Sequence, residues 1–138
     1  MRRRRPGDDQ GTALLEVLAL GVGVLVPLMY AVVSVMSVHS AAYAATSAAR
    51  EAARAYVTSG SPAQGSARAR AATRVVLADA GVRAAGPRVR CVGGCLQPGS
   101  RVDVTVSVAV ALPLLPGGPT VTVVGEESMP VDRYRVSP

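Results

Sequence analysis

The sequence predicts an α+β protein in which a long N-terminal transmembrane helix extends outside the membrane into a small head of one helix on a three- to four-stranded antiparallel sheet. Three observations support this class: an uncharged apolar run at residues 17–38, helix signals at both ends of residues 62–80, and strict alternation at residues 101–112. We divide the chain into a basic leader (1–11), a helix (12–57) and an extracytoplasmic head (58–138).

The uncharged run at residues 17–38 contains 22 residues. At about 1.5 Å of helical rise per residue it spans roughly 33 Å, close to the thickness of a bilayer's hydrocarbon core. Arg2 to Arg5 precede it, and arginines beside a first apolar segment stay on the cytoplasmic side. The sequence therefore predicts a single-pass protein of the cytoplasmic membrane, with its N-terminus inside and its head outside the lipid bilayer.

Glu16 lies at the start of this apolar segment, where a carboxylate costs on the order of 3 kcal/mol at the bilayer centre. A basic leader, a glycine, four uncharged residues and a glutamate before an apolar helix form the signal that prepilin peptidases cut after the glycine. The cut would follow Gly11 and leave Thr12 as the first residue. The new α-amino group of a neighbouring subunit could then neutralise Glu16 during assembly.

Two other interpretations of the N-terminus stay open. The leader could remain as a cytoplasmic tail, which would make the chain a signal-anchored membrane protein with an extracytoplasmic binding or structural head. It could also be a secretory signal peptide cut at Ala42-Tyr43-Ala44, although its apolar region would exceed the usual length of about 7–15 residues. The state of the N-terminus distinguishes these alternatives.

Residues 40–57 contain no glycine or proline and are rich in alanine, which favours continuation of the helix to Val57. Pro27 removes one backbone hydrogen bond inside the apolar run, either to make the helix flexible or as an ordinary tolerated proline. The alanine-rich surface suits close packing against other helices. His39, the only histidine, is expected to be a polar residue at the outer membrane edge.

The leader, the segment GTALLEVLAL, the single apolar helix and the segment AATSAAREAARAY together resemble the TadE-like family of tight-adherence (Flp) pilus proteins, in its high-GC Gram-positive form. Members are regarded as minor pilins or pseudopilins that serve pilus assembly. The resemblance implies a subunit of such a pilus or a related secretion filament. Its implied partners are a prepilin peptidase, other pilin-like subunits and the inner pilus assembly platform. The family's proline usually lies earlier than Pro27, and Val33-Ser34 replaces a position that is often polar or acidic.

The head begins with a predicted helix that starts at Ser61 and Pro62, with Gln64 completing a capping box, and that ends at Gly81. Ala72, Val75, Val76 and Ala80 are expected to face the sheet. The clearest strand is residues 101–112, with valines on a face that we place under this second helix. Further strands are expected at residues 88–91 and 120–124, a turn at residues 113–119, and an edge segment at residues 129–135.

Cys91 and Cys95 are the only cysteines, and Gly93-Gly94 between them permits a tight turn. Thiols outside the membrane tend to oxidise, so we expect a structural disulfide. Free thiols and an unassigned redox role are the alternatives, because the spacing is not that of a C-x-x-C centre.

Catalysis is not expected, because the head has no histidine, no G-x-S-x-G motif and no phosphate-binding glycine loop. Metal binding would need ligands beyond the two cysteines, so we expect neither a metal nor a cofactor. All 15 cationic residues are arginine, which we ascribe to codon bias in a GC-rich genome. They are scattered and not interleaved with aromatic residues, so the sequence predicts no nucleic-acid partner.

Overall fold

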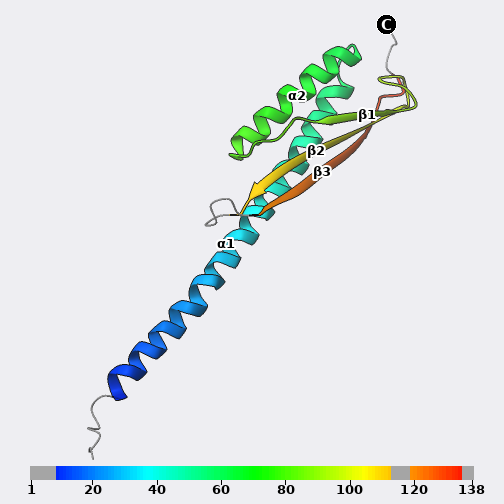
Figure 1. Ribbon diagram of the computed structural model, residues 1–138. Coiled ribbons are helices and arrows are strands. Elements are labelled where there is room, and N and C mark those ends of the chain that lie inside the picture. The colour runs from blue at the N-terminus through cyan, green and yellow to red at the C-terminus, as the bar shows by residue number, and fades with distance from the viewer. Residues whose placement is uncertain (1–8, 113–118, 135–138) are drawn as a thin grey trace, which may run out of the picture.

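The protein is described here by a computed structural model that covers residues 9–112 and 119–134. Its architecture is α+β, as predicted. The elements in chain order are α1 (Asp9–Val57), α2 (Pro62–Asp79), β1 (Arg88–Val92), β2 (Arg101–Ala111) and β3 (Thr120–Pro130). Figure 1 shows that the first part of α1 projects away as a rod, while α2 and the strands lie alongside its second part.

α1 is a single helix of 49 residues, which confirms the prediction of one helix from Thr12 to Val57. Pro27 lies inside it without ending it, although a proline cannot donate the backbone hydrogen bond of its turn. The helix ends where the N–H groups of Thr58 and Ser59 bond back to carbonyls of the last turn. α2 then turns back along α1.

α2 starts with the predicted cap. The Ser61 hydroxyl accepts a hydrogen bond from the backbone N–H of Gln64 at 3.3 Å, and Pro62 occupies the first turn. The Gln64 side chain accepts a hydrogen bond from the Gly60 N–H at 3.0 Å, one residue before the position used in a standard capping box. These bonds satisfy donors that the helix itself leaves unpaired.

The C-terminal end of α2 is a Schellman motif at the predicted glycine. Gly81 has a φ of 67°, a left-handed conformation that glycine adopts without steric cost. The N–H of Val82 donates to the Leu77 carbonyl at 2.8 Å, and the N–H of Gly81 donates to the Ala78 carbonyl at 3.0 Å. The last helical residue is Asp79, so the cap at Gly81 is confirmed.

Within the described residues the sheet has three antiparallel strands in the order β1-β2-β3. β2 and β3 pair over their full lengths, from Arg101 opposite Pro130 to Ala111 opposite Thr120. β3 therefore continues well beyond the predicted end at Val124 and includes the start of the predicted edge segment. Residues 113–118 of the predicted turn, and residues 135–138, lie outside the described part of the chain.

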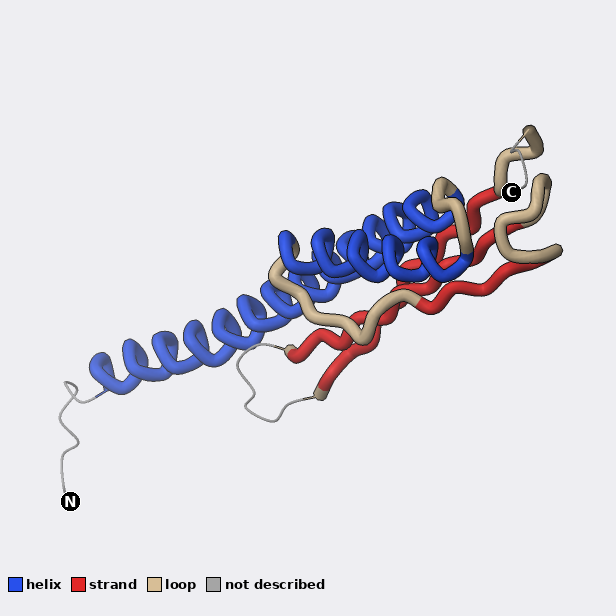
Figure 2. Tube along the Cα trace, turned by 90° about the horizontal axis from the view of Figure 1, so that it is seen from above, coloured by secondary structure: helices blue, strands red, loops and turns tan. Residues whose placement is uncertain are grey.

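The valine face of β2 is buried, as its alternation predicts, but the helix that covers it is α1 and not α2. Val102, Val104, Val106 and Val108 are almost fully inaccessible to solvent. They belong to one core with the alanine stripe of α1, which we define as Ala41, Ala44, Ala45, Ala48, Ala49, Ala52 and Ala53. α1 contacts both β2 and β3 and also packs against α2. Figure 2 shows the two helices as one layer and the strands as the other.

The surface of α2 that was predicted to face the sheet is only partly buried: Ala72 and Val76 are half-buried, and Ala80 is exposed. Val75 is 62% exposed, whereas Gly65, Ala69, Thr73 and Leu77 are buried. These buried residues recur every fourth position and so form one helical face. The face is small because it lies against the alanine stripe of a neighbouring helix, where bulky side chains would hold the two helices apart.

Gly125 marks the closest approach between the sheet and α1. It lies in the middle of β3, and a Cβ atom added there would overlap the backbone of Ala45 and Thr46. A glycine inside a strand often indicates such an approach by another backbone. Because α1 supplies the core of the head from Ala41 onward, the packed unit includes the helix end that we had placed before the head.

Candidate functional site

The first half of α1 is a long apolar surface that the described part of the chain leaves uncovered. Between Ala13 and Met36 the leucine, valine and methionine side chains are almost all exposed on every side of the helix. An 18-residue window in this helix has a mean hydropathy of 2.3, and none of it is buried. The helix is long and apolar enough to cross a membrane (Figure 1).

The structure places Gly11 and Thr12 in the first turns of α1, which begins at Asp9. The first four N–H groups of a helix have no partner within it, so this end unwinds at low cost. The bond between Gly11 and Thr12 is also far along α1 from the part that packs into the head, which begins at Ala41. The remainder of the predicted leader, residues 1–8, lies outside the described residues.

Glu16 lies one helical turn after Thr12, so both residues are on the same side of α1. Its side chain is exposed and makes no hydrogen bond or ion pair with any described residue. Every described neighbour in the following two turns is apolar. Within the described chain, the carboxylate thus has no internal partner and is available to a cation from another molecule.

Tyr30 and Ser34 are two polar residues in the apolar half, of which the sequence analysis named only Ser34. Their hydroxyl oxygens are the only buried side-chain polar atoms without a hydrogen-bond partner in the described part of the chain. The two residues are four positions apart and lie on the same side of α1 as Ala41 and Ala48. A tyrosine and a serine one turn apart in an otherwise apolar run is the signal that could have identified them.

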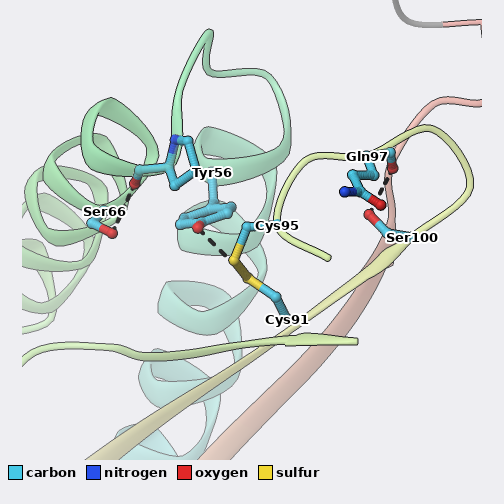
Figure 3. Close-up of a disulfide and its surroundings, with 7 residues drawn as sticks. Tyr56, Ser66, Cys91, Cys95, Gln97 and Ser100 are labelled. Atoms are coloured by element: carbon cyan, nitrogen blue, oxygen red, sulfur yellow. Dashed lines mark hydrogen bonds between the residues drawn. A yellow bond between two sulfur atoms is a disulfide. The ribbon is translucent and has the colours of Figure 1, made fainter. Parts of the chain in front are cut away.

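The sulfur atoms of Cys91 and Cys95 lie at disulfide distance, 1.97 Å, in agreement with the predicted bond. Figure 3 shows the Tyr56 hydroxyl pointing at this bond, with the oxygen 3.7 Å from the Cys91 sulfur. On its other side the Tyr56 ring lies against Gly65 of α2, where an added Cβ would approach the ring to 3.0 Å. Tyr56 therefore joins the end of α1 to α2 and to the disulfide.

Charged groups in the described residues make few contacts. The one ion pair there joins Arg50 Nε of α1 to Glu127 Oε2 of β3 at 3.5 Å. No group of three or more His, Cys, Asp or Glu in the described ranges is arranged to hold a metal ion. His39 is exposed, and its ring meets Tyr43 edge to face at 5.2 Å.

No protein-family model, curated protein or solved structure matched the chain in the comparisons with known proteins.

Proposed function

We propose that this chain is a pilin-like subunit, of the minor pilin or pseudopilin kind, in a tight-adherence pilus or a related secretion filament. It is inserted in the cytoplasmic membrane by α1, with its head outside, and is cut after Gly11 by a prepilin peptidase. The observation that carries the proposal is one continuous helix whose first half is exposed, apolar and marked by an unpaired Glu16, and whose second half is built into the head.

α1 has an exposed first half and a second half that packs into the head, and this arrangement supports assembly through the first half. Because the head holds residues 41–56 firmly, any force on the head is transmitted to the apolar half through a continuous helix. Lipid or the apolar helices of other subunits can surround residues 13–36 equally well, since both present hydrocarbon surfaces. A subunit with this surface can therefore move from the bilayer into a bundle of like helices without refolding its head.

Glu16 supplies the specificity that apolar contacts lack. A carboxylate among apolar helices is stabilised when a cation meets it, and removing the cation leaves an uncompensated charge. In the cut chain the α-amine of Thr12 would lie one turn from its own Glu16. The proposed pairing joins this amine to the Glu16 of an adjacent subunit that is shifted along the helix axis. The pairing would thus set the axial offset between adjacent subunits in the filament.

N-terminal sequencing of the membrane-fraction protein tests the cleavage. We expect the mature chain to begin at Thr12, and Gly11→Leu to keep the leader because the cut depends on the glycine. Finding Met1 or Arg2 at the N-terminus of the wild-type chain would contradict the pilin proposal. It would favour the second candidate, a signal-anchored protein with an extracytoplasmic binding head, which the same apolar helix also suits.

Glu16→Gln tests the assembly step. This substitution keeps the shape and hydrogen-bonding capacity of the side chain but removes its charge, so membrane insertion should be unchanged or easier. Cleaved chains that carry Glu16→Gln should fail to crosslink or co-purify with other pilin-like subunits. Glu51→Gln, the same change at an exposed carboxylate outside the apolar half, is the matched control and should assemble normally. Normal association and piliation by Glu16→Gln would contradict charge pairing.

A further inference from the structure

A groove of about 600 Å³ lies between the C-terminal half of α2 and the chain that leads from it to β1. Two arginines, Arg74 and Arg83, line it, and both are exposed. Leu77 is buried, and Val82 and Ala84 are half-buried, so the deeper lining of the groove is apolar. The groove thus combines two cationic groups with a hydrocarbon surface.

Three other polar groups of the groove are bonded within the protein. The Thr73 hydroxyl donates to the Ala69 carbonyl at 2.9 Å. The backbone N–H groups of Gly81 and Val82 bond to carbonyls of the last turn of α2. The nearest acidic residue in sequence, Asp79, does not line the groove. The two guanidinium groups are the charged groups that line this groove, and they select an anion.

The groove lies close to the outer end of the apolar half of α1. α2 runs back along α1 from the contact between Gly65 and Tyr56 (Figure 1). The 16 residues from Gly65 to Gly81 correspond to about 24 Å of helix, which returns the chain to the level of about residue 40 of α1. That level, at the Gly81 end of the groove, is about 3 Å beyond Val38, the last residue of the uncharged run, and so lies within a headgroup layer of about 5–7 Å. Arg74, seven residues earlier on α2, lies about 10 Å farther from the membrane, so the groove runs outward from the headgroup layer.

We propose that this groove binds an anionic phospholipid of the outer leaflet, with Arg74 and Arg83 on the phosphodiester and Leu77, Val82 and Ala84 against the glycerol and upper acyl chain. An anionic lipid fits because it carries both a phosphate and a hydrocarbon part, and the end of the groove at Gly81 lies within the headgroup layer. Such binding would fix the orientation of the head on the membrane. This inference rests on the membrane insertion in the proposed function.

Native mass spectrometry of the full chain, released from bilayer discs of equal phosphatidylglycerol and phosphatidylcholine, provides the test. We expect the wild-type chain to retain phosphatidylglycerol preferentially. The double variant Arg74→Gln/Arg83→Gln should lose this preference by roughly fivefold for each arginine removed, since a basic residue at an anionic surface contributes about that much. The matched control is Arg54→Gln/Arg68→Gln, which removes two exposed arginines that do not line the groove.

An unchanged preference in the groove variant, or an equal loss in the control, would overturn the proposal. Displacement of the lipid by equimolar glycerophosphoglycerol, the soluble headgroup, would also overturn it, because the apolar contacts would then contribute nothing. Alkaline carbonate extraction separates this result from the proposed function. A chain that the carbonate releases from membranes is not inserted, which contradicts the proposed function itself, whereas an inserted chain without lipid preference contradicts the groove alone.

Discussion

Residues 13–36 and residues 41–56 belong to the same helix and are both rich in apolar side chains, but they differ in side-chain size. The first segment is dominated by leucine and valine and stays exposed, while the second is dominated by alanine and is buried along one face. An alanine buries little area of its own. It lets β3 and α2 approach the helix axis, so that the valines of β2 close the core over it.

The difference shows that hydrophobicity alone does not tell which half of a helix forms a protein's own core. The bulky half has more apolar surface, and the structure leaves it uncovered, as suits contact with lipid or with other chains. The small half permits backbone contacts that a leucine would prevent. Substitutions that enlarge a small side chain in each half of the helix therefore test this difference between the two halves.

The largest effect is expected at Gly125, where β3 touches α1. Gly125→Ala would place a Cβ into the backbone of Ala45 and Thr46, and backbone cannot move aside as a flexible side chain can. We expect a loss of about 3 kcal/mol or more in the free energy of unfolding of the head. Pulse proteolysis of the full chain in detergent micelles over a urea series measures it.

Gly21→Ala is the matched control in the exposed half. Nothing lies within 4 Å of a Cβ built there, and alanine favours a helix over glycine by roughly 0.5–1 kcal/mol. We therefore expect no loss of head stability from this variant. Equal stability of the Gly125 and Gly21 variants would contradict the close approach of β3 to α1.

The next effect compares one substitution in the two halves. Ala48→Leu adds three carbons at a fully buried position, and we expect it to cost the head about 2–3 kcal/mol by overpacking. Ala31→Leu makes the same change where the helix is exposed, and should leave head stability unchanged. The same urea series decides between them, and a tolerated Ala48→Leu would mean that the alanine stripe is not closely packed.

Much of this fold follows from local signals in the sequence. The caps at Ser61 and Gly81, the alternation in β2 and the length of α1 are local properties, because each depends on residues within a few positions of one another. The element that covers the valine face of β2, in contrast, is distant from β2 in sequence. We assigned it to α2 because the alanine-rich end of α1 was expected to leave the membrane and pack against other helices, whereas this end is the element that lies against the sheet.

The features of the candidate site likewise include some that follow from local spacing and one that depends on residues far apart in sequence. The prediction of Gly11, Thr12 and Glu16 rests on spacing alone, and it stays a prediction until the N-terminus is sequenced. The prediction that Cys91 pairs with Cys95 rested on their separation, on the glycines between them and on the expected location of the head outside the membrane. The contact of this disulfide with Tyr56 joins residues 35 positions apart, so no local pattern could have predicted it.

The disulfide provides the third prediction. Cys91→Ser/Cys95→Ser opens a loop of five residues, and loop entropy predicts a loss of about 2 kcal/mol in head stability. The effect should be largest where Tyr56 joins α1 to α2, so hydrogen exchange should rise at that end of the alanine stripe and not between residues 13 and 36. Alkylation of two thiols in the untreated wild-type protein under non-reducing conditions would contradict the bond itself.

The smallest effect is expected from the ion pair between Arg50 and Glu127, which joins the second half of α1 to β3 at 3.5 Å. The arginine side chain is 65% exposed, so water and salt screen the attraction, and an exposed pair contributes about 0.2–1 kcal/mol. Arg50→Gln should therefore cost less than about 1 kcal/mol in the urea series, and added salt at about 0.5 M should remove most of the difference from the wild type. Arg54→Gln, one turn along the helix, makes the same charge change at a residue whose side chain pairs with no described group, and serves as the control. If Arg50→Gln instead cost as much as Ala48→Leu, the attachment of the sheet to α1 would depend on charge, and the contrast in side-chain size between the two halves would not explain why only one of them is buried.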